Sequence, residues 1–208
     1  MVISELVRET AKSLTDNARF EAELMVMNVL GISRTQLVTG GRNAVTEEKC
    51  EKVSEMVKRR QSGEPLQYIL GECEFMSLDF YVESGVLIPR SDTETLVETV
   101  LEKTDEDKKL KILDICTGSG CIGISTAHFR PSAYVDLIDI SDKAIEVAKK
   151  NIDRNNVRDR VKVQKMDILN EYPQEKYDIV VSNPPYIETE VIDTLQTEVK
   201  NHEPLFST

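Results

Sequence analysis

The segment Asn183-Pro184-Pro185-Tyr186 contains the residue types needed to hold a planar amino group as a nucleophile. Two consecutive prolines fix φ and remove two N–H donors, so backbone carbonyls and the Asn183 side-chain oxygen remain as acceptors. Two acceptors that bind both hydrogens of an –NH2 group leave its π face toward an electrophile, and Tyr186 can stack on its plane. The segment therefore predicts chemistry at an amide or base nitrogen, for which a dehydrogenase has no use.

A glycine-rich turn supplies a second candidate site, Asp114-Ile115-Cys116-Thr117-Gly118-Ser119-Gly120-Cys121-Ile122-Gly123. Gly118 and Gly120 permit backbone conformations that are closed to other residues, and they allow a ligand to approach the chain closely. The spacing also satisfies G-x-G-x-x-G, and Asp139 follows 19 residues after Gly120. By itself this pattern is compatible with a dinucleotide site and with a nucleoside site.

Two acidic residues at predicted strand ends could complete a nucleoside site. Asp139 ends the second predicted strand, where its carboxylate can accept hydrogen bonds from both hydroxyls of a ribose. Asp167 follows the third strand and precedes Ile168 and Leu169. This combination of a polar acceptor and apolar side chains suits an adenine ring. A lone acid in a loop is common, so Asp167 is equally compatible with a purely local role.

These motifs require a scaffold, and the second half of the chain predicts one. Four apolar segments have the character of short strands, and helical segments between them produce an alternating βαβαβ order. The continuous Ile179-Val180-Val181 is typical of a strand buried in a parallel sheet. Ligands bind beyond the carboxyl ends of such strands, which is where every motif above lies. The predicted strands are 111–116, 133–140, 161–166 and 177–182.

The first part of the chain predicts helices, and a connector separates it from the sheet. Residues 73–90 contain alternating and β-branched residues around Glu83-Ser84-Gly85, which predicts a hairpin or an extended linker. Ser91-Asp92-Thr93-Glu94 matches the S-x-x-E capping box and predicts the start of a helix. We therefore expect a helical domain over 1–72, a connector over 73–90 and a ligand-binding α/β domain over 91–208.

Composition narrows the class of protein. Lys and Arg number 26 against 37 Asp and Glu, so the net charge is −11 and the chain repels phosphate backbones. No apolar run approaches the ~18 residues of a membrane helix, and residues 1–10 lack a signal-peptide pattern. The four cysteines include no C-x-x-C pair, so they signal neither a metal site nor a disulfide framework. We expect a cytoplasmic protein that binds no metal, does not associate with a membrane and does not bind nucleic acid directly.

In combination, the motifs resemble those of class I S-adenosylmethionine methyltransferases. More narrowly, the whole chain resembles the HemK/PrmC family, the N5-glutamine methyltransferases of peptide-chain release factors. Asn-Pro-Pro-Tyr is shared with adenine-N6 DNA methyltransferases, whereas its combination with Ile88-Pro89-Arg90-Ser91-Asp92-Thr93-Glu94 is far more specific. Residues 18–37 and 63–69 match the family's helical N-terminal domain.

The resemblance implies a reaction and a set of site residues. A methyl group would pass from S-adenosylmethionine, leaving S-adenosylhomocysteine, to the glutamine amide of the Gly-Gly-Gln motif in class I release factors. The domain over 1–72 would recognise the substrate. The cofactor would contact Cys116, Thr117, Gly118, Ser119 and Gly120 with its methionine part, Asp139 with its ribose, and Asp167 and Ile168 with its adenine. The glutamine amide would contact Asn183, Pro184, Pro185 and Tyr186, of which Asn183, Pro184 and Tyr186 would be catalytic and Asn183 would also border the cofactor.

Two features depart from the family pattern. Cys116 stands where the family usually has glycine, and its side chain would narrow the cofactor site. The family's Rossmann-like sheet has seven strands in the order 3-2-1-4-5-7-6, whereas this sequence predicts four. We therefore expect a C-terminally incomplete sheet whose fourth strand is an unprotected apolar edge.

Other functions fit parts of the pattern. An adenine-N6 nucleic-acid methyltransferase shares Asn-Pro-Pro-Tyr, although the negative charge opposes it. An NAD-dependent oxidoreductase is supported only by G-x-G-x-x-G. A binding fragment without catalytic activity would retain the same motifs.

Overall fold

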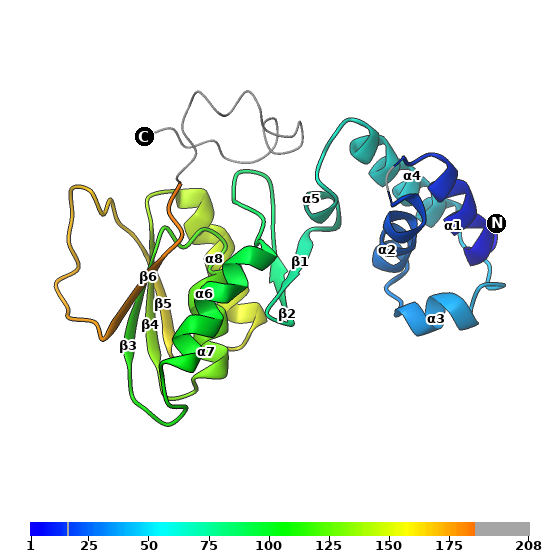
Figure 1. Cartoon of the computed structure of the whole chain (residues 1–208). Coiled ribbons are helices and arrows are strands. Elements are labelled where there is room, and N and C mark those ends of the chain that lie inside the picture. The colour runs from blue at the N-terminus through cyan, green and yellow to red at the C-terminus, as the bar shows by residue number, and fades with distance from the viewer. Residues whose placement is uncertain (16, 186–208) are drawn as a thin grey trace. The chain divides into compact units, whose positions relative to one another are not determined.

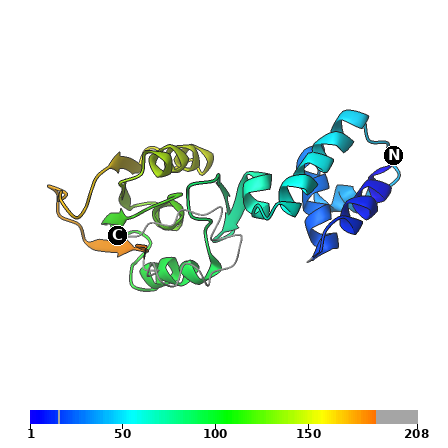
Figure 2. The same cartoon turned by 90° about the horizontal axis from the view of Figure 1, so that it is seen from above.

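The computed structural model describes residues 1–15 and 17–185 of the chain. These residues form two compact units, divided between Leu70 and Gly71. The first unit is helical, and the second combines a hairpin, a parallel sheet and covering helices (Figures 1 and 2). Of the described helices, none has both the length and the apolar composition that a bilayer-spanning segment needs.

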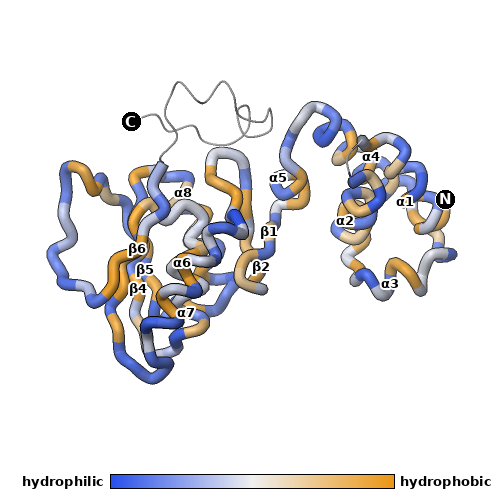
Figure 3. Tube along the Cα trace, viewed as in Figure 1, coloured by the Kyte–Doolittle hydropathy of each residue, from blue (hydrophilic) through white to orange (hydrophobic). Residues whose placement is uncertain are grey.

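Short helices build the first unit. Hydrophobic and hydrophilic residues alternate along them (Figure 3), and the apolar side chains meet in one core. Ile3, Leu6, Val26, Leu37 and Val53 are buried there. The helices are α1 (Ile3–Lys12), α2 (Ala18–Leu30), α3 (Arg34–Thr39), α4 (Glu47–Gln61) and α5 (Leu66–Leu70).

A β-hairpin opens the second unit. Strands β1 (Glu72–Phe75) and β2 (Leu78–Tyr81) pair antiparallel across the two-residue turn Met76-Ser77. Both turn residues have positive φ, 52° and 58°, as a type I′ turn requires. The sequence predicts a hairpin or an extended linker around Glu83-Ser84-Gly85. The hairpin turns earlier in the chain, and Glu83-Ser84-Gly85 form a separate turn in the loop after β2, where the N–H of Val86 donates to the Glu83 carbonyl at 3.3 Å.

The S-x-x-E motif marks a helix, but its side chains do not form the predicted capping box. Helix α6 (Ser91–Glu102) starts at Ser91, its N-cap residue is Arg90, and its N-cap makes no side-chain capping bond. Glu94 instead accepts a hydrogen bond at Oε1 from the backbone N–H of Met76 at 2.6 Å. This contact satisfies the backbone donor of Met76 in the hairpin turn and stabilises a turn in which two residues other than glycine have positive φ.

A four-stranded parallel sheet forms the centre of the second unit. Its strand order, β5-β4-β3-β6, places the four predicted strands in the order 3-2-1-4 that the family resemblance implies. The fold-class prediction is therefore confirmed. The strands are β3 (Lys111–Ile115), β4 (Tyr134–Asp139), β5 (Val161–Lys165) and β6 (Ile179–Ser182), and the helices between them are α7 (Cys121–Phe129) and α8 (Asp142–Arg154).

The two faces of the sheet differ. Helices α6, α7 and α8 lie on one side (Figure 1), where Ile112, Ile124 and Leu137 are fully buried in the core. On the other face, Val180 of β6 is 57% exposed. In the part of the chain that the structure describes, β6 is an edge strand, as predicted.

Candidate functional site

The carboxyl ends of the four strands lie at one edge of the sheet, because the strands are parallel and their register brings their last residues beside one another. Ile115, the last residue of β3, pairs with Ser182, the last residue of β6, and with the penultimate residue of β4. The backbone oxygen of Asp139 accepts a hydrogen bond from the N–H of Met166, which follows β5 (3.0 Å). The segments that follow β5, β4, β3 and β6 therefore lie side by side along this edge, in that order.

Asp139 is joined directly to the glycine-rich turn. Its Oδ2 accepts from the N–H of Gly118 at 2.9 Å, and its Oδ1 accepts from the N–H of Ser141 at 3.0 Å. The N–H of Thr117 donates to the carbonyl of Ile138 at 3.1 Å. A carboxylate oxygen can accept more than one hydrogen bond, so Asp139 is oriented by the protein and keeps capacity for two ligand hydroxyls.

Asp114 braces the same turn from within the core. Its Oδ2 accepts from the Thr117 hydroxyl at 2.6 Å and from the N–H of Gly123 at 3.0 Å, which ties the turn to α7. Its Oδ1 is buried and has no hydrogen-bonding partner among the described residues. Burial raises the pKa of Asp114 to about 7, against the lowering effect of the bonds from Thr117 and Gly123. The motif in the sequence includes Asp114 and assigns it no role, although an acid inside an apolar strand is a usable signal.

The glycines of the turn have different functions. Gly120 has φ +83°, and a Cβ there would lie 2.8 Å from Ile124 Cδ1, so Gly120 is required for close packing. Gly118 has φ +56°, and the nearest atom to its Cβ position is Val86 Cγ1 at 3.9 Å. Gly118 therefore presents open backbone beside Asp139, which fits a ligand that lies across the turn.

Cys116 occupies a left-handed conformation, with φ +57°. This region costs an L-residue roughly 1 kcal/mol and costs glycine little, which explains why glycine is favoured at the position. The side chain is half-buried. Burial, and then the nearby charges of Asp139 and Asp114, raise the pKa of the Cys116 thiol. The thiol is therefore a neutral, small group at the start of the turn.

Asp167 also lies at this edge, and its carboxylate is engaged locally. Its Oδ1 accepts from the N–H of Leu169 at 3.1 Å, and its Oδ2 accepts from the Asn170 amide at 2.8 Å. These bonds match the purely local role that the sequence left open. They leave the remaining lone pairs free for a ligand, and the half-buried Ile168 follows directly.

Asn183 directly follows β6, next to the glycine-rich turn. The hydroxyl of Ser182 donates to the Ile115 carbonyl at 2.8 Å, which joins the ends of β6 and β3. The Asn183 Nδ2 donates to the Thr93 hydroxyl of α6 at 3.4 Å, and Thr93 belongs to the I-P-R-x-D-T-E motif. Pro184 and Pro185 are exposed. Tyr186 lies outside the described residues.

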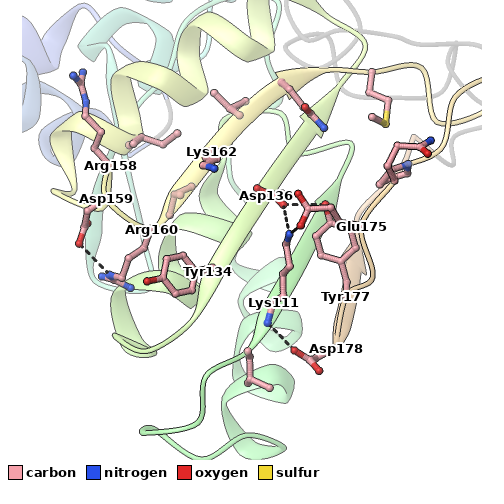
Figure 4. A pocket seen from close by; sticks show the side chains of 18 of the residues that line it. Lys111, Tyr134, Asp136, Arg158, Asp159, Arg160, Lys162, Glu175, Tyr177 and Asp178 are labelled. Carbon is pink, nitrogen blue, oxygen red and sulfur yellow. Dashed lines mark hydrogen bonds and ion pairs between the residues drawn. The ribbon is translucent and has the colours of Figure 1, made fainter.

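A large hollow lies elsewhere, over the face of the sheet away from the helices and around β5 to the last turns of α8 (Figure 4). It has a volume of about 1340 Å³ and contains an ion-pair network in which Lys111 contacts Asp136 and Glu175. Tyr177 donates to Asp136 at 2.9 Å. In the described part of the chain, none of the predicted site residues lines this hollow. Within residues 1–15 and 17–185, no three His, Cys, Asp or Glu side chains converge as a metal site requires.

Comparison with known proteins assigns the chain to a family. A model of the PrmC N-terminal domain matches residues 4–71, and the model called Methyltransferase small domain matches residues 90–201. A release factor glutamine methyltransferase of Clostridium botulinum is 40% identical over 210 residues, which cover 98% of this chain and 74% of that protein. The chain belongs to the release factor glutamine methyltransferase family. This result confirms the predicted resemblance, the enzyme class and S-adenosylmethionine as the cofactor.

Other relatives of the same name show the same extent of similarity. The protein of Clostridium acetobutylicum is 42% identical over 189 residues, covering 90% of this chain and 66% of that protein. The protein of Fusobacterium nucleatum is 38% identical over 205 residues, covering 98% of this chain and 58% of that protein. The chain thus spans between 58% and 74% of the length of these three relatives.

Proposed function

We propose that this chain methylates the side-chain amide nitrogen (N5) of the glutamine in the Gly-Gly-Gln motif of class I peptide-chain release factors. The observation that carries the proposal is the adjacency of two motifs at one sheet edge. The pairing of Ile115 with Ser182 brings the glycine-rich turn beside Asn183. A cofactor on the turn and an amide at Asn183 would therefore be neighbours, as a direct transfer requires.

The residues at the edge fit S-adenosylmethionine in their chemistry. Asp139 would hold the ribose hydroxyls, and Asp167 with Ile168 would border the adenine. The turn from Cys116 to Gly120, in which Cys116 and Gly118 are only half-buried, would surround the methionine part. The order of these residues along the edge agrees with the order of the three parts in the cofactor. When bound, S-adenosylmethionine supplies a methyl group that is already electrophilic, so the protein need not activate it.

The protein's task is then to orient a poor nucleophile. The lone pair of an amide nitrogen is delocalised into its carbonyl group. Asn183 Oδ1 and the Pro184 carbonyl would accept its two hydrogens and fix the direction of the nitrogen. Because Nδ2 of Asn183 faces the Thr93 hydroxyl, Oδ1 is the atom of this side chain left for the substrate. Such preorganised acceptors stabilise the reacting geometry, and the product's proton can leave after transfer.

Replacement of Asn183 by alanine tests this site. Asn183→Ala should lower methylation of a Gly-Gly-Gln peptide by about 10²-fold or more, by analogy with the loss of one preorganised polar contact. The readout is mass spectrometry of a release factor after incubation with protein and S-adenosylmethionine, and an adenine-containing DNA duplex serves as the competing substrate. The control is Asn155→Ala, since Asn155 caps the C-terminal end of α8, away from the sheet edge, and contacts Asp79. Turnover near that of the unmodified chain in Asn183→Ala, or methylation of DNA alone, would contradict the proposal.

The proposed function also implies where in the cell the protein acts and which part of it binds the release factor. Release factors act in translation, so we place the protein in the cytoplasm. We further propose that the helical unit recognises the release factor. This unit is compact and has its own hydrophobic core.

A further inference from the structure

Asn151 is a fully buried polar residue on α8, which carries none of the predicted site residues. Its side chain makes three hydrogen bonds to backbone groups outside α8. The Oδ1 atom accepts from the N–H of Tyr81 at 2.6 Å. The Nδ2 atom donates to the carbonyl of Tyr81 at 3.0 Å and to the carbonyl of Ser119 at 2.9 Å. Both of its N–H donors are thus used, as a buried amide requires.

These partners fix the orientation of the amide. The Tyr81 N–H needs an acceptor, whereas the two carbonyls need donors. If the Asn151 amide were rotated by 180°, its NH2 group would face the Tyr81 N–H and its oxygen would face the two carbonyls, so all three hydrogen bonds would be lost. The side chain therefore has one arrangement, and a carboxylate of the same shape could not reproduce it.

On the hairpin side, Asn151 acts like a residue of a neighbouring strand. The N–H of Val82 donates to the carbonyl of Gly71 at 3.2 Å, toward β1. Successive residues of an antiparallel strand direct their backbone groups to opposite sides, so those of Tyr81 face away from β1. Asn151 forms hydrogen bonds with both the N–H and the carbonyl of Tyr81, as a residue of a neighbouring strand would.

On the other side, Asn151 holds the middle of the glycine-rich turn. The N–H of Gly118 is bound to Asp139, and the N–H of Gly120 donates to the Thr117 carbonyl at 2.9 Å. The Ser119 carbonyl, between them, is bound to Asn151. Asn151 of α8 therefore joins Asp114 of β3 and Asp139 of β4 as a side chain that orients the turn.

The hairpin also contributes to the surroundings of the turn. Val86, in the loop after β2, is buried against Ala144 and Val147 of α8. Its Cγ1 lies 3.9 Å from the position that a Cβ on Gly118 would take. Displacing β2 would therefore move an apolar side chain at the open face of Gly118.

We propose that Asn151 is a positioning residue for cofactor binding, which joins β2 to the glycine-rich turn and sets the orientation of both. The inference rests on the proposed function, since that function assigns the turn to S-adenosylmethionine. Asn151 touches neither the cofactor nor the substrate in this scheme. It acts through the Ser119 carbonyl and the Tyr81 backbone.

The end of the same helix offers a matched control. Asn155 is the C-cap residue of α8, four residues after Asn151, and its Nδ2 donates to the carbonyl of Asp79 in β2 at 3.2 Å. It thus binds the same hairpin and has no recorded contact with the glycine-rich turn. Asn155→Ala removes the bond to the hairpin and a second bond from Nδ2 to the backbone carbonyl of Asn151 (3.1 Å), and it leaves the Asn151 side chain bound to Ser119. Changes at Asn151 release Ser119.

The experiment compares S-adenosylmethionine binding by the full chain and its variants. Asn151→Ala, Asn151→Asp and Asn155→Ala are titrated by calorimetry at 15 °C, after circular dichroism has established that each is folded. We expect Kd to rise at least tenfold in both Asn151 variants and to stay within twofold in Asn155→Ala. In turnover assays, KM for S-adenosylmethionine should rise with little change in kcat.

A purely structural role of Asn151 would lower Tm and leave Kd at 15 °C unchanged, and that result would overturn the proposal. Equal weakening in all three variants would overturn it as well.

Hydrogen exchange on the unmodified chain decides the matter if the Asn151 variants do not fold. Saturating S-adenosylmethionine should slow exchange of the Tyr81 amide several-fold more than that of the Val82 amide, because only Tyr81 is bound to Asn151. Equal slowing of the two amides would contradict the inference. An unmodified chain that binds no S-adenosylmethionine would instead refute the proposed function, and the inference with it.

Discussion

Asp114 combines complete burial with a carboxylate oxygen that has no partner among the described residues. Burial raises its pKa to about 7, well above the ordinary value of 3.8. Between about pH 4 and pH 7 the folded chain therefore binds a proton at Asp114 that the unfolded chain has lost. Linkage then requires the free energy of unfolding to fall as pH rises through this window, by at most about 1.4 kcal/mol per pH unit.

Asp114→Asn should remove this dependence. Asparagine keeps an oxygen that can accept from Thr117 and Gly123, and it cannot ionise. Urea unfolding of both proteins at pH 5, 6, 7 and 8 gives the difference in unfolding free energy. This difference should move in favour of the variant as pH rises, and Asp142→Asn, an exposed change on α8, serves as the control. A difference that stays constant across the range would show that Asp114 does not titrate there.

Helix α7 follows the glycine-rich turn directly, and Gly123 determines how closely this helix packs on the sheet. A Cβ at Gly123 would lie 2.2 Å from Leu137 Cδ2, 3.1 Å from Val135 Cγ1 and 3.1 Å from Asp114 Oδ2. Leu137 is itself fully buried, so α7 must move away from β4 to admit a methyl group. Overpacking of this kind costs about 1–3 kcal/mol.

Gly123→Ala should therefore lower the unfolding free energy by this amount and weaken S-adenosylmethionine binding, because the N–H of Gly123 is one of the bonds that orient Asp114. Chemical denaturation and calorimetric titration measure the two effects. Ser125→Ala is the control on the same helix, since the Ser125 hydroxyl is buried and finds no partner among the described residues. Equal stability of the two variants would mean that α7 can shift freely on the sheet.

At the scale of the whole molecule, the division between Leu70 and Gly71 separates two hydrophobic cores. The glycine-rich turn, Asp139 and Asn183 all belong to the second unit. A chain that lacks residues 1–70 should therefore still bind S-adenosylmethionine, with Kd within about threefold of the intact chain. Under the proposed function it should bind a release factor at least tenfold more weakly, because the helical unit supplies recognition. Calorimetry measures the first quantity and surface plasmon resonance the second. Loss of cofactor binding with retained release-factor binding would reverse the assignment.

Local patterns in the sequence are sufficient for the strands of the parallel sheet and for the motifs at their ends. Strands β3 to β6 were predicted within about two residues, because runs of β-branched and apolar residues are visible without knowledge of the fold. The parallel alternation then required the segments containing Cys116, Asp139, Asp167 and Asn183 to share one edge. Family membership supports the chemistry expected there.

Tertiary structure alone decided which residues orient those segments. Glu94 caps the turn at Met76, 18 residues away, and Asn151 binds Tyr81, 70 residues away. Neither contact leaves a periodic or motif signal, because a hydrogen bond between distant segments depends on packing and not on neighbours in the chain. The sequence by itself thus determined the elements, the motifs and their common edge. The buried partners that hold this edge in shape could be identified only once the chain was folded.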